Sequence, residues 1–342
     1  MKILIITKNL YPGIGGPYNV ITSTVKQLIK NSDLKVKLLA KNDSYKADKI
    51  SWFSVIKKSD IIHYYGGWDF FYIKIAVISF LLKKLFICTP MGIFEPWSLN
   101  QKEIKKKFAL FLYQKKILDN CAAIHATSET EKENIKKITI NNNIITIPHG
   151  IDHALNQNKK TFFNNDTKKA LFFSRIHKKK GIMDLVNVWK KIKDKDWELH
   201  IYGPDQDEIG KAILKKINPE NKIFLHDAIF SEKEKFKIFK ESDIFILPTK
   251  SENFGYVVLE SLSAGLPVLT TNKTPWNNIV ESDAGWIIDD NELSLEIMLR
   301  KIFTLDKNDF QIKSVNALKL SKQYLWDTVL PKYISFYKNF NR

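Results

Sequence analysis

Short apolar runs that alternate with longer helical stretches are the feature that most constrains the fold of this chain. Strands are expected at about 2–7, 34–40, 61–64, 85–89, 123–126 and 144–147, and helices at about 70–83, 102–120 and 128–137. Strands and helices that alternate along a chain fold into parallel sheets covered by helices. The pattern therefore predicts an α/β fold.

The same pattern begins again after an asparagine- and lysine-rich stretch at 153–168, which we interpret as a linker. Strands are then expected at about 170–174, 198–202, 222–226 and 244–247, and a helix at 181–192. A length of 342 residues suits two domains better than one.

We therefore expect two Rossmann-like, doubly wound domains that face a cleft, at 1–160 and 168–321, with a C-terminal helix at about 322–342 that packs back on the first domain. Ligands of such open α/β sheets bind at the carboxyl ends of the strands. The loops that follow strands are therefore where functional residues are expected.

The net charge of +17 is unevenly distributed, because residues 1–160 carry +13 and residues 161–342 carry +4. A basic half favours an anionic partner, such as nucleic acid, an acidic lipid surface or a phosphorylated small molecule. Since 51 of the 54 basic residues are lysine, a bias toward lysine codons is an alternative origin of the total. We find no nucleic-acid recognition motif and expect no nucleic-acid partner.

Residues 101–117 form a basic amphipathic segment in which Ile104, Phe108, Phe111 and Leu112 share one helical face. This face either belongs to the core or rests on anionic lipid. The N-terminus lacks the apolar region of an export signal, and the longest apolar run, at 75–82, is too short to span a membrane. Only two cysteines are present, which suits a reducing compartment. We expect a cytoplasmic protein, peripheral on the inner face of the plasma membrane.

A glycine-rich loop, Pro12-Gly-Ile-Gly-Gly-Pro17, separates the first strand from the first helix. Its backbone could approach a phosphate closely at the helix N-terminus, or the loop could be a tight turn and nothing more. Tyr18 occupies the third glycine position of the dinucleotide fingerprint. This departure argues against a nicotinamide-dependent dehydrogenase.

The corresponding loop of the second half is Ser174-Arg-Ile-His-Lys-Lys-Lys-Gly181. Two of its cations could clamp a diphosphate, because arginine offers a planar fork of donors and lysine a point charge. The alternative is a solvated run of charges.

Glu252 and Glu260 lie eight residues apart after the strand at 244–247. We expect Glu252 at the entrance of the helix that carries Glu260, and this spacing then places both carboxylates roughly on one face of that helix. Such carboxylates could accept hydrogen bonds from the hydroxyls of a sugar or ribose, or they could simply cap the helix.

The stretch Ser251-Glu-Asn-Phe-Gly-Tyr-Val-Val-Leu-Glu-Ser-Leu-Ser-Ala-Gly-Leu-Pro-Val268 resembles the E-x7-E region of retaining GT-B glycosyltransferases of family four. Further similar motifs follow the family's order along the chain: His63–Trp68, Thr89–Trp97, His125–Glu129, Ile147–Asp152, Arg175 with Lys180-Gly181, and Thr270–Trp276. Two of them, Thr89–Trp97 and His125–Glu129, are similar to a subgroup found in bacterial lipopolysaccharide, capsule and exopolysaccharide synthesis.

The resemblance implies roles for the acidic and basic residues. Arg175 and Lys180 would bind and stabilise the departing nucleotide diphosphate, Glu260 would hold the ribose hydroxyls, and Glu252 the hydroxyls of the donor sugar. The other implied donor-binding residues are Gly15, Gly16, Gly203, Asn253, Phe254 and Gly255. The catalytic residues implied are Arg175, Lys180 and Glu252.

The implied activity is a metal-independent transfer of a sugar, with retention, from a nucleotide-diphosphate donor (a UDP-sugar by preference) to a bacterial surface glycan or lipid-linked acceptor. The leaving phosphate would help to deprotonate the acceptor. No cofactor is implied, and we interpret Asp205-Gln-Asp207 as a surface loop rather than a metal site. His63, His125, His200 and His226 are expected to be structural. The alternative is a basic α/β protein that binds nucleic acid or membranes without transferase activity.

Three positions depart from the family pattern. Met91 stands where a donor such as His or Arg is frequent, Tyr65 replaces the second His of a His-x-His motif, and His149 replaces Asn. Contacts of the N-terminal domain with the donor sugar are therefore the least defined part of the implied site.

Overall fold

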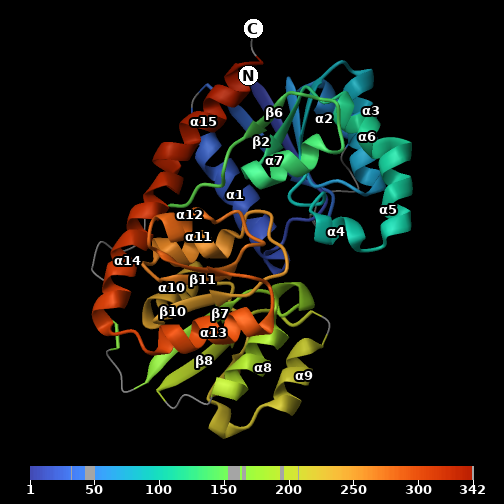
Figure 1. Cartoon of the computed structure of the whole chain (residues 1–342). Helices are drawn as coiled ribbons and strands as arrows, with labels where there is room; N and C mark the ends of the chain where they lie inside the picture. The colour runs from blue at the N-terminus through green and yellow to red at the C-terminus, as the bar shows by residue number, and fades with distance from the viewer. Residues whose placement is uncertain are drawn as a thin grey trace. The chain divides into compact units, whose positions relative to one another are not determined.

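The computed structural model describes residues 1–31, 33–42, 51–152, 162–163, 167–192, 196–206 and 208–340. The chain forms two compact units, unit 1 (Met1–Gly150 and Trp326–Arg342) and unit 2 (Ile151–Leu325). Each unit contains a six-stranded parallel sheet flanked by helices (Figure 1), which confirms the predicted α/β class with two doubly wound sheets. Most of the predicted linker, at 153–161 and 164–166, lies outside the described residues.

The sheet of unit 1 has the strand order β2-β1-β3-β4-β5-β6. Its central strands are largely apolar because helices cover both faces, and all five residues of β3 are buried, whereas the edge strand β2 carries exposed lysines. The elements in chain order are β1 (Lys2–Thr7), α1 (Gly16–Ile29), β2 (Lys35–Ala40), α2 (Trp52–Lys57), β3 (Ile61–Tyr65), α3 (Phe70–Leu81), β4 (Leu85–Thr89), α4 (Pro96–Asn100), α5 (Glu103–Ala109), a π-helical turn (Leu110–Gln114), α6 (Lys115–Asp119), β5 (Ala123–Ala126), α7 (Glu129–Lys136), β6 (Ile144–Thr146) and α15 (Trp326–Lys338).

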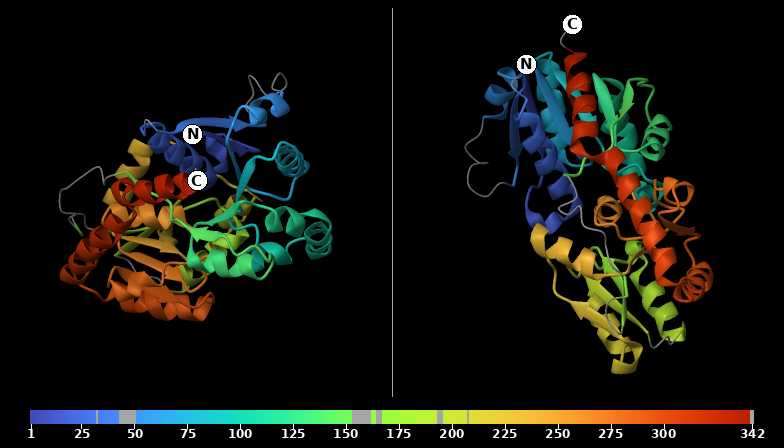
Figure 2. Two further views of the ribbon diagram at one scale, coloured as in Figure 1. Left: turned by 90° about the horizontal axis from the view of Figure 1, so that it is seen from above. Right: turned by 90° about the vertical axis from the view of Figure 1, so that its left-hand side faces the viewer.

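Helix α15, the last of the chain, completes the core of unit 1 and runs alongside α1 (Figure 2). Tyr333 and Tyr337 are fully buried against β1 and β3, and the Trp326 indole N–H donates to the Ser23 hydroxyl 3.0 Å away. A Cβ on Gly150 would lie 2.4 Å from the Trp326 ring, so only glycine fits where the chain passes this helix.

A chain of hydrogen bonds crosses the centre of unit 1. His125 Nε2 lies 2.8 Å from the Ile147 carbonyl, and His125 Nδ1 lies 2.9 Å from Thr89 Oγ1. Thr89 Oγ1 is also 2.6 Å from His63 Nε2, whose Nδ1 is 2.7 Å from Tyr337 Oη. Burial lowers the pKa of both histidines, so each ring carries one N–H. Because the Ile147 carbonyl only accepts, the donors then follow: Tyr337 donates to His63, His63 to Thr89, Thr89 to His125 and His125 to Ile147. Both histidines are structural, as expected.

The sheet of unit 2 has the strand order β12-β11-β10-β7-β8-β9 and its own apolar core. The sequence did not lead us to expect β11 and β12. The elements in chain order are β7 (Lys168–Phe173), a 3₁₀ turn (Lys178–Lys180), α8 (Ile182–Ile192), β8 (Trp197–Tyr202), α9 (Ile209–Lys216), β9 (Ile223–His226), α10 (Glu232–Glu241), β10 (Ile244–Leu247), α11 (Tyr256–Ser263), β11 (Val268–Thr271), α12 (Asn278–Glu281), β12 (Gly285–Ile288), α13 (Glu292–Phe303) and α14 (Lys307–Ser321).

The single helix expected at 102–120 is instead α5, the π-helical turn and α6. The interpretation of its apolar face as core is wrong, because the four side chains are 86, 65, 80 and 47% exposed: Ile104, Phe108, Phe111 and Leu112. A π-helical turn adds a residue to the helix and shifts the face of the residues that follow. Among the described residues, no helix is long and apolar enough to span a membrane.

Candidate functional site

Lys180 is placed by a 3₁₀ turn that follows β7 and ends at Gly181. Gly181 has a left-handed φ of 68°, and a Cβ there would lie 1.9 Å from the Pro248 carbonyl oxygen. Glycine is therefore required for this turn to approach the segment that follows β10. The Lys250 N–H and the Thr249 hydroxyl both donate to the Lys179 carbonyl, at 2.7 and 3.0 Å, and hold the two loops together.

The two joined loops bring Lys180 and Glu252 into a buried ion pair between Nζ and Oε1, with both side chains 10% exposed. Two of the predicted catalytic residues thus meet at the carboxyl ends of β7 and β10. A buried pair of charges is costly to desolvate and by itself contributes little to stability. At strand ends, where α/β sheets bind ligands, such a pair is a candidate for binding a charged or polar ligand.

Glu252 does not lie on the helix that carries Glu260, so the expectation of one helical face was wrong. Helix α11 begins only at Tyr256, because Gly255 has a left-handed φ of 72° and forms the N-cap. Residues 251–255 form a loop, and the Glu252 N–H donates to the Lys273 carbonyl at 2.9 Å. The two carboxylates therefore reach their positions from a loop and a helix, each with its own cationic partner.

The loop from Ser251 to Gly255, which includes Asn253, is anchored through Phe254. The Phe254 carbonyl accepts a hydrogen bond from the Trp276 indole, and its ring packs against those of Trp276 and Tyr324 with centroids 5.3 and 6.1 Å apart. Because the Phe254 carbonyl already accepts this hydrogen bond, it is less available as an acceptor for a ligand.

Arg175 lies on the exposed part of the loop that follows β7, and its Nη1 donates to Gln206 Oε1 at 3.0 Å. Gly203, with φ of 147°, ends β8 so close to β7 that a Cβ would lie 1.8 Å from the Ser174 carbonyl oxygen. The close approach at Gly203 therefore joins the loop of Arg175 to the loop that follows β8.

Glu260 projects from α11 and pairs with Lys235 of α10, with Nζ 2.6 Å from Oε1. Burial raises the pKa of Glu260, and the Lys235 ammonium opposes that rise. The predicted residues Arg175, Lys180, Gly203, Asn253, Phe254, Gly255, Glu252 and Glu260 all belong to unit 2, whereas Gly15 and Gly16 belong to unit 1.

Gly15 ends the glycine-rich loop of unit 1 with a left-handed φ of 68° and caps α1, and a Cβ on Gly15 or Gly16 would meet no atom within 4 Å. The positions that depart from the family pattern are also defined. Met91 has a left-handed φ of 57°, which is strained for methionine, while Tyr65 and His149 are buried. These three residues thus belong to the interior or to a strained loop.

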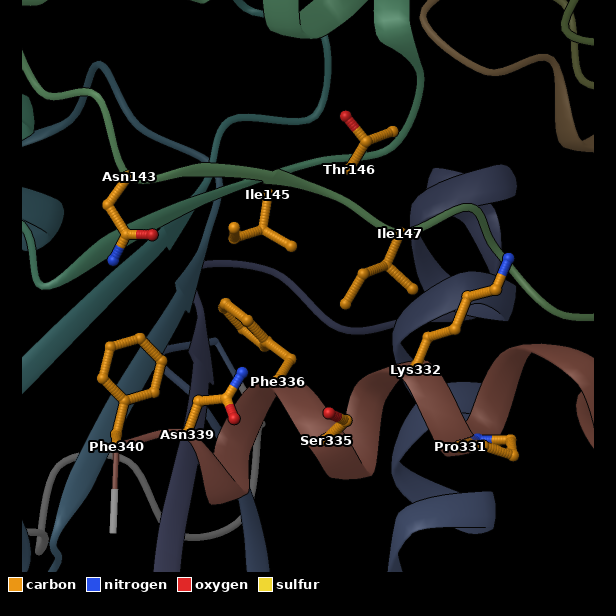
Figure 3. A pocket seen from close by; sticks show the side chains of 10 residues that line it. All are labelled: Asn143, Ile145, Thr146, Ile147, Pro331, Lys332, Ser335, Phe336, Asn339 and Phe340. Atoms are coloured by element: carbon orange, nitrogen blue, oxygen red, sulfur yellow. The ribbon is translucent and has the colours of Figure 1, made fainter. Parts of the chain in front are cut away.

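A pocket of about 590 Å³ lies between β6 and α15 in unit 1 (Figure 3). Its lining is Asn143, Ile145, Thr146, Ile147, Pro331, Lys332, Ser335, Phe336, Asn339 and Phe340, which includes no predicted site residue. Within the described ranges, no group of three or more His, Cys, Asp or Glu could hold a metal ion. Asp207, the second acid of the Asp-x-Asp stretch, lies outside those ranges.

The residues that contact the predicted site residues were not expected from the sequence. Thr249, Trp276 and Gln206 contact them directly, and Lys235 is the buried partner of Glu260. Trp276 belongs to the Thr270–Trp276 motif. For Lys235, the available signal is its position four residues before Phe239, on the same helical face.

Comparison with known proteins gives this site a context. Residues 154–313 match the family described as group 1 glycosyl transferases. A GDP-mannose:cellobiosyl-diphosphopolyprenol alpha-mannosyltransferase of Xanthomonas campestris is 22% identical, with 98% of this chain and 96% of that protein covered.

Two solved structures resemble the whole chain. Sucrose-phosphate synthase from Thermosynechococcus elongatus has a TM-score of 0.78 at 15% identity, with 99% of this chain and 98% of that one covered. HepE of Anabaena, solved in complex with UDP and glucose, has a TM-score of 0.77 at 15% identity, with 99% of each chain covered. The structural comparisons show a fold shared with these two proteins, and the sequence comparisons show similarity to glycosyltransferases, one of them named for capsular polysaccharide biosynthesis. These similarities do not favour the alternative of a binding protein without transferase activity.

Proposed function

On the premise that residues 154–313 match the group 1 glycosyl transferases, we propose that this protein transfers a sugar from a nucleotide-diphosphate donor to a bacterial surface glycan. The observation that carries the proposal is the buried Lys180–Glu252 pair at the carboxyl ends of β7 and β10. A diphosphate offers Lys180 an alternative anion, and the hydroxyls of a sugar offer Glu252 alternative donors.

The donor site that we propose uses the basic and acidic side chains of unit 2. Arg175 and Lys180 bind the diphosphate and stabilise the charge that develops as the anomeric C–O bond breaks. Glu252 holds the sugar and Glu260 the ribose, while Gly203, Asn253, Phe254 and Gly255 of unit 2 and Gly15 and Gly16 of unit 1 contribute backbone contacts.

We propose that the transfer retains the anomeric configuration and uses neither a metal nor a cofactor. The acceptor oxygen bonds to the anomeric carbon on the face that the diphosphate leaves, and the acceptor proton passes to a leaving phosphate oxygen. A UDP-sugar is the preferred donor. The structure of HepE with UDP and glucose supports this preference, whereas the name of the Xanthomonas relative specifies GDP-mannose.

Ligand-induced stabilisation identifies the donor. A nucleotide that binds only the folded protein raises its melting temperature, and at one hundred times Kd the gain is about 2.7 kcal/mol. We expect UDP, or failing that GDP, to raise Tm, while nicotinamide dinucleotide and duplex DNA should not.

Transfer activity should then be lost in Arg175→Gln, whose exposed side chain is not needed for folding, and kept in Lys211→Met, an exposed lysine of α9. Full turnover by Arg175→Gln would remove it from the proposed site.

We also propose that the acceptor is lipid-linked and that unit 1 binds an anionic membrane surface on the cytoplasmic side, without contact to nucleic acid. The support is the exposed apolar face of α5 and the π-helical turn, which is flanked by exposed Lys105 and Lys107. The name of the Xanthomonas relative specifies a diphosphopolyprenol acceptor.

Vesicle sedimentation tests the membrane proposal. Binding should require anionic lipid and should be lost when Ile104, Phe108 and Phe111 are replaced by serine. In a matched control, serine replaces Leu293 and Ile297 of α13, which are 68 and 61% exposed, and this variant should still bind. Equal loss in both variants, or equal binding to neutral vesicles, would contradict a specific membrane face.

A further inference from the structure

Lys235 is a buried cation in a helix that also carries the exposed lysines Lys233 and Lys237. Helix α10 turns Lys235 and Phe239 inward, four residues apart, and leaves Lys233 and Lys237 exposed. The Lys235 side chain is 9% exposed, compared with 74% for Lys237. A lysine at an inward position, one turn from a buried phenylalanine, needs a partner for its charge.

That partner is Glu260, whose side chain is 12% exposed. Lys235 Nζ lies 2.6 Å from Glu260 Oε1 and 2.7 Å from Oε1 of Glu232, which is 66% exposed. Among the described contacts, Lys235 engages one Glu260 oxygen and leaves Oε2 for another donor. The ammonium thus fixes the orientation of the carboxylate without using its full capacity to accept hydrogen bonds.

The charge on Glu260 depends on this arrangement. Burial and the nearby Glu232 carboxylate raise the pKa of Glu260, and Lys235 is the cation that opposes them. Tyr256 of α11 also faces this cluster, and its pKa is raised well above its ordinary value by burial and by Glu260, Glu232 and Asp152, so that it stays neutral. The protonation of Glu260 therefore depends on the charges that surround it, and Lys235 is the cation that favours its ionised form.

We propose that Lys235 is the positioning residue that keeps Glu260 ionised and oriented to accept hydrogen bonds from the vicinal ribose hydroxyls of the donor nucleotide. This inference rests on the proposed function, in which Glu260 holds the ribose. An ionised carboxylate accepts from two neighbouring hydroxyls, whereas a protonated one must itself donate and loses part of that capacity.

The first test compares Lys235→Met with Lys237→Met, a change of the same chemistry on the exposed side of the same helix. Calorimetric Kd values for UDP and GDP should rise about tenfold or more in Lys235→Met and stay within twofold in Lys237→Met. The change reflects loss of a charge-assisted hydrogen-bond geometry. Lys235→Arg, which keeps the charge, should recover most of the affinity.

The second test measures the pH dependence of nucleotide binding. A purely structural role of Lys235 would leave this dependence unchanged. Binding should weaken as pH falls through the pKa of Glu260. Lys235→Met removes the opposing cation and should move this acid limb to higher pH, while Glu232→Gln removes a like charge and should move it to lower pH. Titration of the diphosphate itself is common to all three proteins and cancels in the comparison.

The third test removes the ribose hydroxyls. The wild-type protein should bind the 2′,3′-dideoxy form of the nucleotide more weakly, and Lys235→Met should cause no further loss with that ligand. If neither UDP nor GDP binds the wild-type protein, the proposed function fails. If UDP or GDP binds the wild-type protein but Lys235→Met and Lys237→Met have the same Kd, the role of Lys235 alone is overturned. The same holds if Lys235→Met and Glu232→Gln move the acid limb of binding in the same direction.

Discussion

Between its sheet and α15, unit 1 buries a neutral network of histidine, threonine and tyrosine, whereas unit 2 buries oppositely charged pairs, one at the carboxyl ends of β7 and β10 and one between α10 and α11. In unit 1, each of His63, Thr89 and His125 donates one hydrogen bond and accepts another, without a formal charge. In unit 2, Lys180 meets Glu252 and Lys235 meets Glu260 with side chains 9–12% exposed.

The difference lies between a neutral network and buried pairs of opposite charge. Unit 1 also buries the Glu131 carboxylate, but this group accepts hydrogen bonds from two backbone N–H groups and the Thr127 hydroxyl. A satisfied neutral network costs little to bury and fixes strands and helix in one arrangement. Buried ion pairs are costly to desolvate, so their presence in unit 2 points to ligand binding rather than to stability. The following predictions test this contrast, from the largest expected effect to the smallest.

Acidification should act first and most strongly on unit 1. Burial lowers the pKa of His63 well below 6.5, and lowers those of His125 and His149 to about 4 and about 3. Between pH 6.5 and about 4 the unfolded chain therefore binds more protons than the folded one. The free energy of unfolding should fall with falling pH, by about 1.4 kcal/mol per histidine per pH unit.

Hydrogen exchange at pH 7.5 and pH 5, compared at equal chemical exchange rates, measures this effect separately in β3–β5 and in β10–β11. The pKa values of His200 and His226 in unit 2 are also lowered by burial, but both side chains are partly exposed. Earlier opening of β10–β11 than of β3–β5 on acidification would contradict the comparison.

Removal of one partner from the buried Lys180–Glu252 pair of unit 2 should have the next largest effect on the free energy of unfolding. Lys180→Met or Glu252→Gln should each lower the free energy of unfolding, by about 3–5 kcal/mol when the remaining group stays charged. The double variant should be more stable than the sum of the single changes predicts, because it leaves no uncompensated charge. Denaturant unfolding of the three variants measures the coupling, and strict additivity would show that the two groups do not interact.

Thr89→Val should have an intermediate effect in unit 1. It keeps the shape of the side chain but deprives His63 Nε2 and His125 Nδ1 of their shared partner. Each of these two buried nitrogens, left without a partner, should lower the free energy of unfolding by about 1–3 kcal/mol. Thr270→Val in unit 2 is the matched control, because that buried hydroxyl donates only to the Leu247 carbonyl, at 2.9 Å. A larger loss of unfolding free energy in Thr270→Val would be inconsistent with a shared network.

Lys211→Met should have the smallest effect. Lys211 pairs with Glu208 at 2.8 Å, but the two side chains are 70 and 77% exposed. Exposed pairs of this kind contribute about 0.2–1 kcal/mol or nothing measurable. A shift of Tm comparable to that of Lys180→Met would show that burial does not distinguish the two pairs.

The fold could be predicted from the sequence where apolar runs were continuous. The expected strands at 2–7, 85–89, 123–126 and 244–247 coincide with β1, β4, β5 and β10. Such strands are buried on both faces and leave a clear pattern. In contrast, β11 and β12 were not expected from the sequence, although β5 and β10 have the same length of four residues.

The candidate site was predictable by residue but not by geometry. The spacing of Glu252 and Glu260 suggested one helix, yet the left-handed Gly255 delays the start of α11 until Tyr256. The pairing of Glu260 with Lys235 joins two helices 25 residues apart. The spacing of four residues between Lys235 and Phe239 puts both on one helical face, but only the packing of α10 decides that this face turns inward toward Glu260.

The discontinuity of unit 1 has a consequence for how the protein is made. Helix α15 supplies Trp326, Tyr333 and Tyr337 to the core of unit 1, yet the ribosome synthesises it after the whole of unit 2. Unit 2 is a continuous segment, so it can fold as soon as it emerges. The first 150 residues must wait with part of their apolar surface uncovered, and nascent chains stalled before Trp326 are where chaperones should bind most strongly.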